Sequence, residues 1–136
     1  YKRQDSTGLL LLTNDGDLAN EIQRSRNNHE KEYHVRVNID ITEDFIKKMS
    51  EGVEILDTVT KPCKVKKTGT RNFSIILTQG LNRQIRRMCD ALHVRVVHLK
   101  RVRIMNIRLG SLRPGEFRTL TRGEEQELRR LVQKRS

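Results

Sequence analysis

The 136 residues include 28 Lys and Arg against 17 Asp and Glu, which gives a formal net charge of +11 and favours a polyanionic partner. This length is typical of one domain with its own hydrophobic core. The longest apolar run, Leu9–Leu12, is too short to cross a bilayer and no signal peptide is visible, so membrane insertion is excluded and a cytoplasmic protein is expected.

The first part of the chain predicts a strand, a helix and a second strand. Leu9–Leu12 is a continuous apolar run before a turn-like segment, which is typical of a strand buried on both faces. Asp17 is expected to cap a short helix after it. From Tyr33 to Ile39 apolar and polar residues alternate, which predicts a half-buried strand.

The middle of the chain predicts a helix followed by further strands. Thr42 is expected to cap the helix and Gly52 to end it. Residues 53–59 resemble a strand weakly, and Cys63–Lys67 resembles one more clearly, with lysines on one face. Alternation from Phe73 onward predicts another strand.

The last third predicts a helix that Asn82 caps, two strands and a closing helix. Core residues of the first helix recur at helical spacing, namely Ile85, Met88, Cys89 and Leu92. Strands are expected at 94–99 and 102–109, with a β-bulge near Ile104–Met105. Thr121 and Glu124 form a capping box for the closing helix. The sum is an α+β fold with a central, mainly antiparallel sheet and flanking helices.

The two cysteines, Cys63 and Cys89, form no CxxC pair and no ligand-like cluster with the four histidines. They are expected to be reduced thiols, so neither a disulfide nor a metal site is predicted.

Basic residues gather at the start of the helix after Asn82. Arg83, Arg86 and Arg87 lie off its apolar stripe, beside two amide side chains. Guanidinium groups can bind phosphate, stack on bases or hold a carboxylate, although a solvated helix flank is the alternative. Further basic residues lie in the predicted strands, namely Lys61, Lys64, Lys66, Lys67, Lys100, Arg101, Arg103 and Arg108. Together they predict one continuous basic surface for structured RNA.

Tyr33 stands at the start of the clearest strand, on its apolar face. It is either a core tyrosine with a satisfied hydroxyl or a ring that stacks on an extruded base. Aromatic residues make up only 4% of the chain, which argues against a platform that stacks several bases. No Ser/His/Asp or Cys/His constellation and no Gly-rich phosphate loop is present. The residues alone therefore predict a basic α+β domain that binds RNA.

Three segments in order resemble the motifs of a known family. Residues Gln4–Asn20 (QDSTGLLLLTNDGDLAN) resemble the first motif of the bacterial pseudouridine synthases of the RsuA/RluB/RluE/RluF family. His29–Val37 (HEKEYHVRV) resembles the second motif and Gln79–Cys89 (QGLNRQIRRMC) the third. Gly52–Lys67 is most similar to the RluF type, which acts on 23S rRNA.

The resemblance implies isomerisation of a specific uridine in ribosomal RNA of the large subunit, without metal or organic cofactor, by a monomeric enzyme. The family cleaves the N-glycosidic bond, turns the uracil and rejoins it through C5. Tyr33 matches the tyrosine that packs on the flipped base, and Arg86 matches the arginine that pairs with the catalytic aspartate, so both are predicted catalytic residues. The predicted RNA-binding residues are Asn82, Arg83, Arg87, Arg101 and Arg103.

The first motif departs from the family pattern Arg-Leu-Asp-x-Asp-Ser-x-Gly. Aligned on Gly8, the second aspartate is Asp5, but the catalytic position is Arg3. Residues are absent between Arg3 and Gln4, or the amino end is altered, or the chain is inactive, or Asp5 substitutes within a shortened loop. Residues 1–136 are expected to form the catalytic domain without its amino-terminal part and without the S4-type RNA-binding domain of the family.

Two rival interpretations remain. The first is a non-catalytic RNA-binding or ribosome-assembly module on the same fold. The second is a ribosomal protein, against which stands the placement of the charge within patterned elements and not in basic tails.

Overall fold

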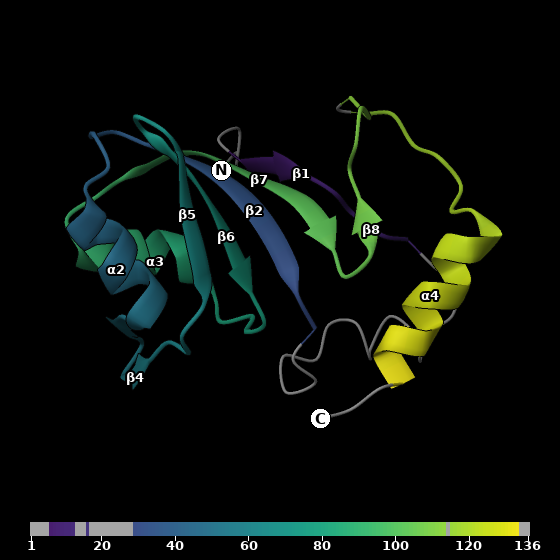
Figure 1. The fold of residues 1–136 in the computed structure, drawn as a ribbon, viewed down its shortest axis with the longest axis horizontal. Coiled ribbons are helices and arrows are strands. Elements are labelled where there is room, and N and C mark those ends of the chain that lie inside the picture. The colour runs from purple at the N-terminus through teal and green to yellow at the C-terminus, as the bar shows by residue number, and fades with distance from the viewer. Residues whose placement is uncertain (1–5, 13–15, 17–28, 114, 134–136) are drawn as a thin grey trace.

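A curved sheet forms the centre of the computed structural model, which describes residues 6–12, 16, 29–113 and 115–133 (Figure 1). Its strand order is β1-β7-β2-β6-β5, with β8 paired to β7. The sheet strands are β1 (Ser6–Gly8), β2 (Lys31–Val37), β5 (Lys64–Gly69), β6 (Asn72–Leu77), β7 (Val96–Ile104) and β8 (Ile107–Arg108). Among these described strands only the β1–β7 pair is parallel, so the prediction of an α+β fold with a mainly antiparallel sheet is confirmed.

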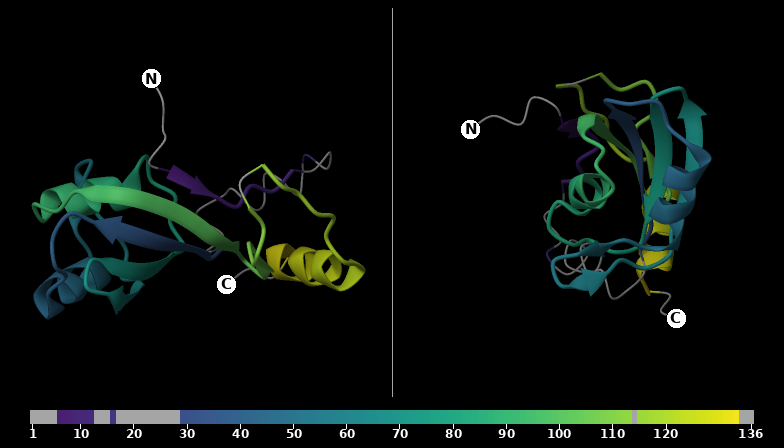
Figure 2. Two further views of the ribbon diagram at one scale, coloured as in Figure 1. Left: turned by 90° about the horizontal axis from the view of Figure 1, so that it is seen from above. Right: turned by 90° about the vertical axis from the view of Figure 1, so that its left-hand side faces the viewer.

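Two helices cover one face of this sheet, α2 (Glu43–Glu51) and α3 (Gln84–Ala91). Alternate residues of the central strands point toward them, and Phe73 and Ile75 of β6 are fully buried. The Phe45 and Phe73 rings meet edge to face with centroids 5.5 Å apart. We call this side the inner face. Figure 2 shows α2 and α3 at one end of the sheet.

The ends of α2 follow from its sequence, as predicted. Thr42 Oγ1 accepts a hydrogen bond of 3.1 Å from the Phe45 N–H. At the other end Gly52 has φ of 120°, and a Cβ there would lie 2.5 Å from the Thr60 carbonyl oxygen. A side chain at residue 52 is therefore excluded by both conformation and space.

A second, smaller core lies at the other end of the molecule, under α4 (Arg122–Gln133) (Figure 1). It contains Leu9, Ile104, Met105, Ile107, Leu128 and Val132. The predicted capping box of α4 is confirmed. Thr121 Oγ1 accepts from the Glu124 N–H at 3.1 Å, and Glu124 Oε1 accepts from the Thr121 N–H at 2.9 Å.

The capping box predicts a specific acid sensitivity. The Arg118 guanidinium, followed by the Thr121 N–H, lowers the pKa of Glu124 from 4.5 to about 2. Since the folded state then binds fewer protons than the unfolded state, this contribution to stability is present above pH 4.5 and is lost as the pH falls toward 2. In urea unfolding followed by circular dichroism, we expect Glu124→Gln to lower stability at pH 7 and to match the unsubstituted chain near pH 2. An equal difference at both pH values would contradict this role.

Two predicted strands near the amino end are corrected. The first strand is Ser6–Gly8 and not Leu9–Leu12, and in the run itself only Leu9 is buried, whereas Leu10 is 68% and Leu12 87% exposed. Strand pairing with β7 ends at Gly8, and only one further backbone bond, from the Leu9 N–H to the Arg101 carbonyl oxygen at 2.8 Å, follows it among the described residues of the run. The strand at Tyr33 ends at Val37, and Ile39 is exposed beyond it. The helix predicted after Asp17 lies outside the described residues.

Backbone conformations with positive φ account for the other differences. Residues 53–59 form a hairpin, β3 (Glu54–Ile55) and β4 (Thr58–Val59), because Leu56 and Asp57 turn the chain with φ of 48° and 63°. The strands predicted at 94–99 and 102–109 are instead the single strand β7 followed by β8. Met105, with φ of 53°, turns the chain between them, so the predicted bulge at Ile104–Met105 is wrong. The pairing of β7 with β2 is irregular at two other residues, Val97 and Val102, which it skips.

Candidate active site

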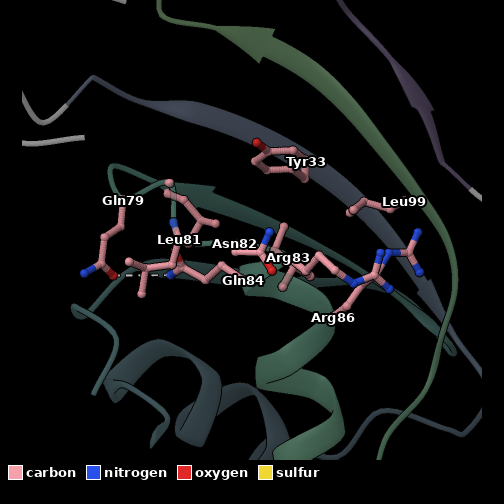
Figure 3. A pocket seen from close by; sticks show the side chains of 11 residues that line it. Tyr33, Gln79, Leu81, Asn82, Arg83, Gln84, Arg86 and Leu99 are labelled. Carbon is pink, nitrogen blue, oxygen red and sulfur yellow. Dashed lines mark hydrogen bonds between the residues drawn. The ribbon is translucent and has the colours of Figure 1, made fainter. Parts of the chain in front are cut away.

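A pocket of about 340 Å³ lies between the inner face of the sheet and the start of α3 (Figure 3). The sheet contributes Tyr33 from β2, Leu77 from β6 and Leu99 from β7. The opposite wall is formed by residues 79–86, which are the loop before α3 and its first turn. An apolar wall with one aromatic ring therefore faces a wall of amides and guanidinium groups.

The register of the sheet places the apolar wall. Val35 pairs with Leu99, and Tyr33 pairs with Ile75 on one side and Arg101 on the other. All of these residues point to the inner face, where Tyr33 and Leu99 are half-buried against the main core. Tyr33 thus combines features of both interpretations, since it packs on the core and also lines the pocket.

Gln84 holds the loop that forms the opposite wall. Its side chain is only 5% exposed, and Oε1 accepts a hydrogen bond of 3.2 Å from the Leu81 N–H. Its Nε2 donates to Gln79 Oε1 at 3.3 Å, which also accepts from the Lys61 N–H at 3.1 Å. The sequence pattern alone does not indicate this role, although Gln84 stands four residues before Met88 on the buried stripe of the helix.

The start of α3 differs from the prediction. The N-cap is Arg83, in the left-handed conformation with φ of 49° and without a side-chain capping bond. Asn82 therefore does not cap the helix. Its Oδ1 accepts from Arg87 Nη2 at 2.9 Å, and its carbonyl oxygen accepts from Arg87 Nε at 3.0 Å. Arg87 ties the loop to the helix on the outside of the pocket wall.

Four of the seven predicted site residues line the pocket, namely Tyr33, Asn82, Arg83 and Arg86. Arg87, Arg101 and Arg103 do not. Arg101 lies on the inner face beside Tyr33, and its Nε donates to the Leu9 carbonyl oxygen at 2.8 Å.

Arg103 is held by protein groups. Its side chain is 12% exposed, and it pairs with Glu32 at 2.9 Å and with Glu30 at 3.2 Å. Its Nη1 also donates to the Met105 carbonyl oxygen at 2.7 Å. These bonds join β2 to the turn after β7, so the guanidinium supports the smaller core.

Lys31 was not among the predicted site residues, but it stands two residues before Tyr33 on the same face of β2. Burial and then the positive charge of Arg101 lower the pKa of its ammonium group. Lys31 pairs with Leu77, one of the pocket residues. In the sequence, the spacing of two residues between Lys31 and Tyr33 could have indicated that both side chains lie on the same face of the strand.

Strand β1 enters the sheet next to the pocket. Ser6 pairs with Leu99, and Gly8 lies so close to β7 that a Cβ would be 2.3 Å from the Arg101 backbone nitrogen. Gly8 also has φ of 127°, which other residues rarely adopt. The glycine of the first motif thus permits this close approach of two backbones. Arg3 and Asp5 lie outside the described residues.

Both thiols in the structure are free. Burial raises the pKa of Cys63 to about 11 and that of Cys89 to about 12, which keeps the two groups protonated at neutral pH. Within the described ranges, no group of three or more His, Cys, Asp or Glu side chains is placed to hold a metal ion. In the same part of the chain, no helix is long and apolar enough to cross a membrane.

Comparison with known proteins agrees with this geometry. The family model for RNA pseudouridylate synthase matches residues 4–91. This range includes the strand of Tyr33 and residues 79–86, which form the opposite wall of the pocket. The chain belongs to the RNA pseudouridylate synthase family. The expected resemblance to pseudouridine synthases is confirmed.

Several members of the RNA pseudouridylate synthase family are similar over nearly the whole chain. The dual-specificity RNA pseudouridine synthase RluF of Escherichia coli K12 is 54% identical over 98% of this chain and 46% of its own length. The ribosomal large subunit pseudouridine synthase B of Bacillus subtilis is 34% identical over 94% of this chain and 55% of its own. A crystal structure of a pseudouridylate synthase superposes with a TM-score of 0.83 at 32% identity, over 91% of this chain and 54% of that one. The chain spans about half the length of these relatives.

Proposed function

We propose that this chain converts a uridine of 23S ribosomal RNA to pseudouridine, as a cytoplasmic monomer in which residues 1–136 form the catalytic unit. The observation that carries the proposal is the pocket that joins Tyr33 of the second motif to Arg86 of the third. These two residues stand 53 positions apart in the sequence, and both match functional positions of the family.

The proposed roles follow from the two walls of the pocket. The Tyr33 ring, flanked by Leu77 and Leu99, offers an apolar surface on which an extruded uracil can stack. Arg86 on the facing wall supplies the positive charge that keeps a catalytic carboxylate ionised in a partly desolvated site. The glycosidic bond from C1′ to N1 breaks, the uracil turns in the pocket, and C5 forms the new bond to C1′. C5 then loses its proton and N1 takes one up, so the product is an isomer of the substrate. The chemistry uses side chains alone.

Extrusion of the base costs a few kcal/mol, which contacts to the RNA backbone must offset. Asn82 and Arg83 are the RNA-binding candidates at the mouth of the pocket, and Arg87 and Arg101 flank it. Arg103 remains the weakest of the proposed RNA contacts because Glu30 and Glu32 occupy its guanidinium. Guanidinium groups suit this work because they bind phosphate oxygens in pairs.

Release of tritium from C5-labelled uridine tests the proposal, with ribosomal RNA that lacks pseudouridine as substrate. The chain as it stands is compared with Arg3→Asp, which restores a carboxylate at the motif position. We expect release by the Arg3→Asp chain because its pocket already holds the tyrosine and the arginine. Release by the unsubstituted chain would assign the chemistry to Asp5 or another residue. No release by either chain, together with tight RNA binding, would favour the non-catalytic RNA-binding module.

A further inference from the structure

The face of the sheet opposite the pocket carries exposed basic side chains. On β2 the side chains of His34 and Arg36 alternate with the inner residues Tyr33, Val35 and Val37, and both are exposed. The main core places α2 and α3 against the inner residues, so neither helix covers this side. Four exposed cations lie here, which we call the outer basic face: Arg36, Lys64, Lys66 and Lys100.

The register places these cations on three of the five strands in the main path of the sheet. Lys66 pairs with Ser74, Ser74 with His34, and His34 with Lys100, so the row crosses β5, β6, β2 and β7. At the usual strand spacing this row spans about 14 Å. Arg36 lies two residues along β2 from this row, and Lys64 lies two residues along β5 from it on the other side, so the cationic surface extends along the strands as well as across them.

No carboxylate of the described residues pairs with any member of the outer basic face, although ion pairs are common elsewhere. Asp44 binds Lys48, Asp40 binds Arg71, and Glu32 binds Arg103. Helix α4 and the segment before it contain three further pairs, which Glu124, Glu125 and Glu127 make with arginines. Glu32 lies on the same side of β2, but Arg103 at 2.9 Å and Arg108 at 3.9 Å pair with its carboxylate. The charges of the four cations are therefore not neutralised by a carboxylate of the described residues.

Protection of a sheet edge explains only part of the pattern. β5 is an edge strand, and exposed lysines such as Lys64 and Lys66 commonly prevent such strands from pairing with other chains. Arg36 and Lys100 lie on β2 and β7, which have neighbours on both sides. Lys100 also stands directly opposite His34, an arrangement that adds no favourable charge pair to the sheet. Binding of a polyanion, in contrast, would explain the cations on the edge strand and those on the interior strands alike.

The chemistry of this face suits phosphate groups and not bases. The phenyl and phenol rings of the described residues lie elsewhere: Tyr33 and Phe73 on the inner face, Phe45 in α2, and Phe117 before α4. The rings on this face are the imidazoles of His34 and His98. Without a Tyr, Phe or Trp ring among the described residues of this face, successive bases of a single strand gain little stacking here. A broad array of cations instead matches the regular phosphate backbone of a helical segment, which proteins recognise by shape and charge.

We propose that the outer basic face binds the phosphate backbone of a double-stranded RNA segment, on the side of the sheet opposite the candidate active site. The inference rests on the proposed function only for the choice of RNA as the polyanion. It gives the domain two RNA contacts, one that holds the target nucleotide and one that holds a helix without reading its sequence.

The test uses the whole chain and the duplex poly(I)·poly(C), which contains no uridine and so offers no target to the pocket. The variant Arg36→Gln/Lys66→Gln/Lys100→Gln removes three charges from the outer basic face. The matched control Lys47→Gln/Arg95→Gln/Arg122→Gln removes three charges from exposed residues outside both this face and the pocket. Dissociation constants are measured between 50 and 200 mM KCl, and urea unfolding checks that each variant is folded.

We expect the outer-face variant to bind at least about tenfold more weakly, and the slope of log K against log salt to become shallower by about three, one for each lost phosphate contact. The control should change the affinity by about twofold or less, and Lys66→Gln and Lys100→Gln alone should each lower the slope by about one. Equal losses in the two triple variants would overturn the inference. Stronger binding to phosphatidylglycerol vesicles than to the duplex would also overturn it and assign the face to a membrane.

These outcomes are independent of the isomerase assay. Absence of tritium release, with a selective loss of duplex binding in the outer-face variant, would refute the proposed function and support the outer basic face. Tritium release with equal duplex binding by both triple variants would support the proposed function and refute the role of the outer basic face.

Discussion

Replacing Arg86 by alanine is expected to lower uridine isomerisation by at least about 10³-fold, while the affinity for RNA changes by less than several-fold. Arg86 lines the pocket from the first turn of α3, opposite Tyr33. In the proposed mechanism its charge keeps a carboxylate ionised and oriented, so its loss acts on the chemical step. Tritium release and filter binding are measured in whichever chain, unsubstituted or Arg3→Asp, is active.

Two controls separate this role from a general loss of positive charge. Arg95→Ala removes an exposed arginine outside the pocket and should leave turnover unchanged. Arg86→Lys keeps the charge but not the planar pair of donors, so its turnover should lie between those of the unsubstituted chain and Arg86→Ala. Equal losses of turnover and of RNA affinity in Arg86→Ala would contradict the role and make Arg86 an RNA-binding residue.

Replacing Gly8 by alanine is expected to lower the free energy of unfolding by about 2–4 kcal/mol and to abolish isomerisation. The new Cβ would lie 2.3 Å from the backbone nitrogen and 2.6 Å from the carbonyl oxygen of Arg101, neither of which can turn aside. The φ of 127° adds strain for any residue with a side chain. Strand β1 must therefore move away from β7, where Ser6 pairs with the pocket residue Leu99.

Gly16→Ala is the matched control for this substitution. No heavy atom lies within 4 Å of a Cβ at residue 16, so its unfolding free energy should change by about 0.5 kcal/mol or less. Both variants are compared by urea denaturation. An unchanged midpoint for Gly8→Ala would show that the backbones of β1 and β7 do not approach as closely as the structure indicates.

Elements with strong local signals were predictable from the sequence. The helix from Thr42 to Gly52 is specified by a capping hydroxyl and a terminal glycine, and both act through atoms a few residues apart. The alternation in β2 and β6 and the Thr121–Glu124 capping box are local in the same sense. The predicted strand boundaries were wrong where Leu56, Asp57 and Met105 adopt positive φ and turn the chain. Ordinary residues rarely adopt this conformation, and tertiary packing holds them in it.

Four residues of the pocket lining were named from the sequence, but the shape of the pocket was not predictable. Tyr33 and Arg86 stood out through the family motifs, and the structure adds the amide bonds of Gln84 that hold the facing loop. Arg103 illustrates the limit of counting charges. It was predicted to face RNA, but the fold brings Glu30 and Glu32 to its guanidinium. Which acid meets which base depends on strand register, and a register cannot be derived from either strand alone.

By itself, the sequence determined the fold class, the family, the ends of α2, the capping box of α4 and the basic character of this protein, because each depends on composition or on neighbours along the chain. Only the tertiary structure decided that Tyr33, Leu99 and Arg86 share one pocket, that Gly8 must lack a side chain, and that four cations gather on the far face of the sheet. The physical reason is that the pairing of distant strands sets which side chains meet, and it also sets which ones stay exposed to solvent.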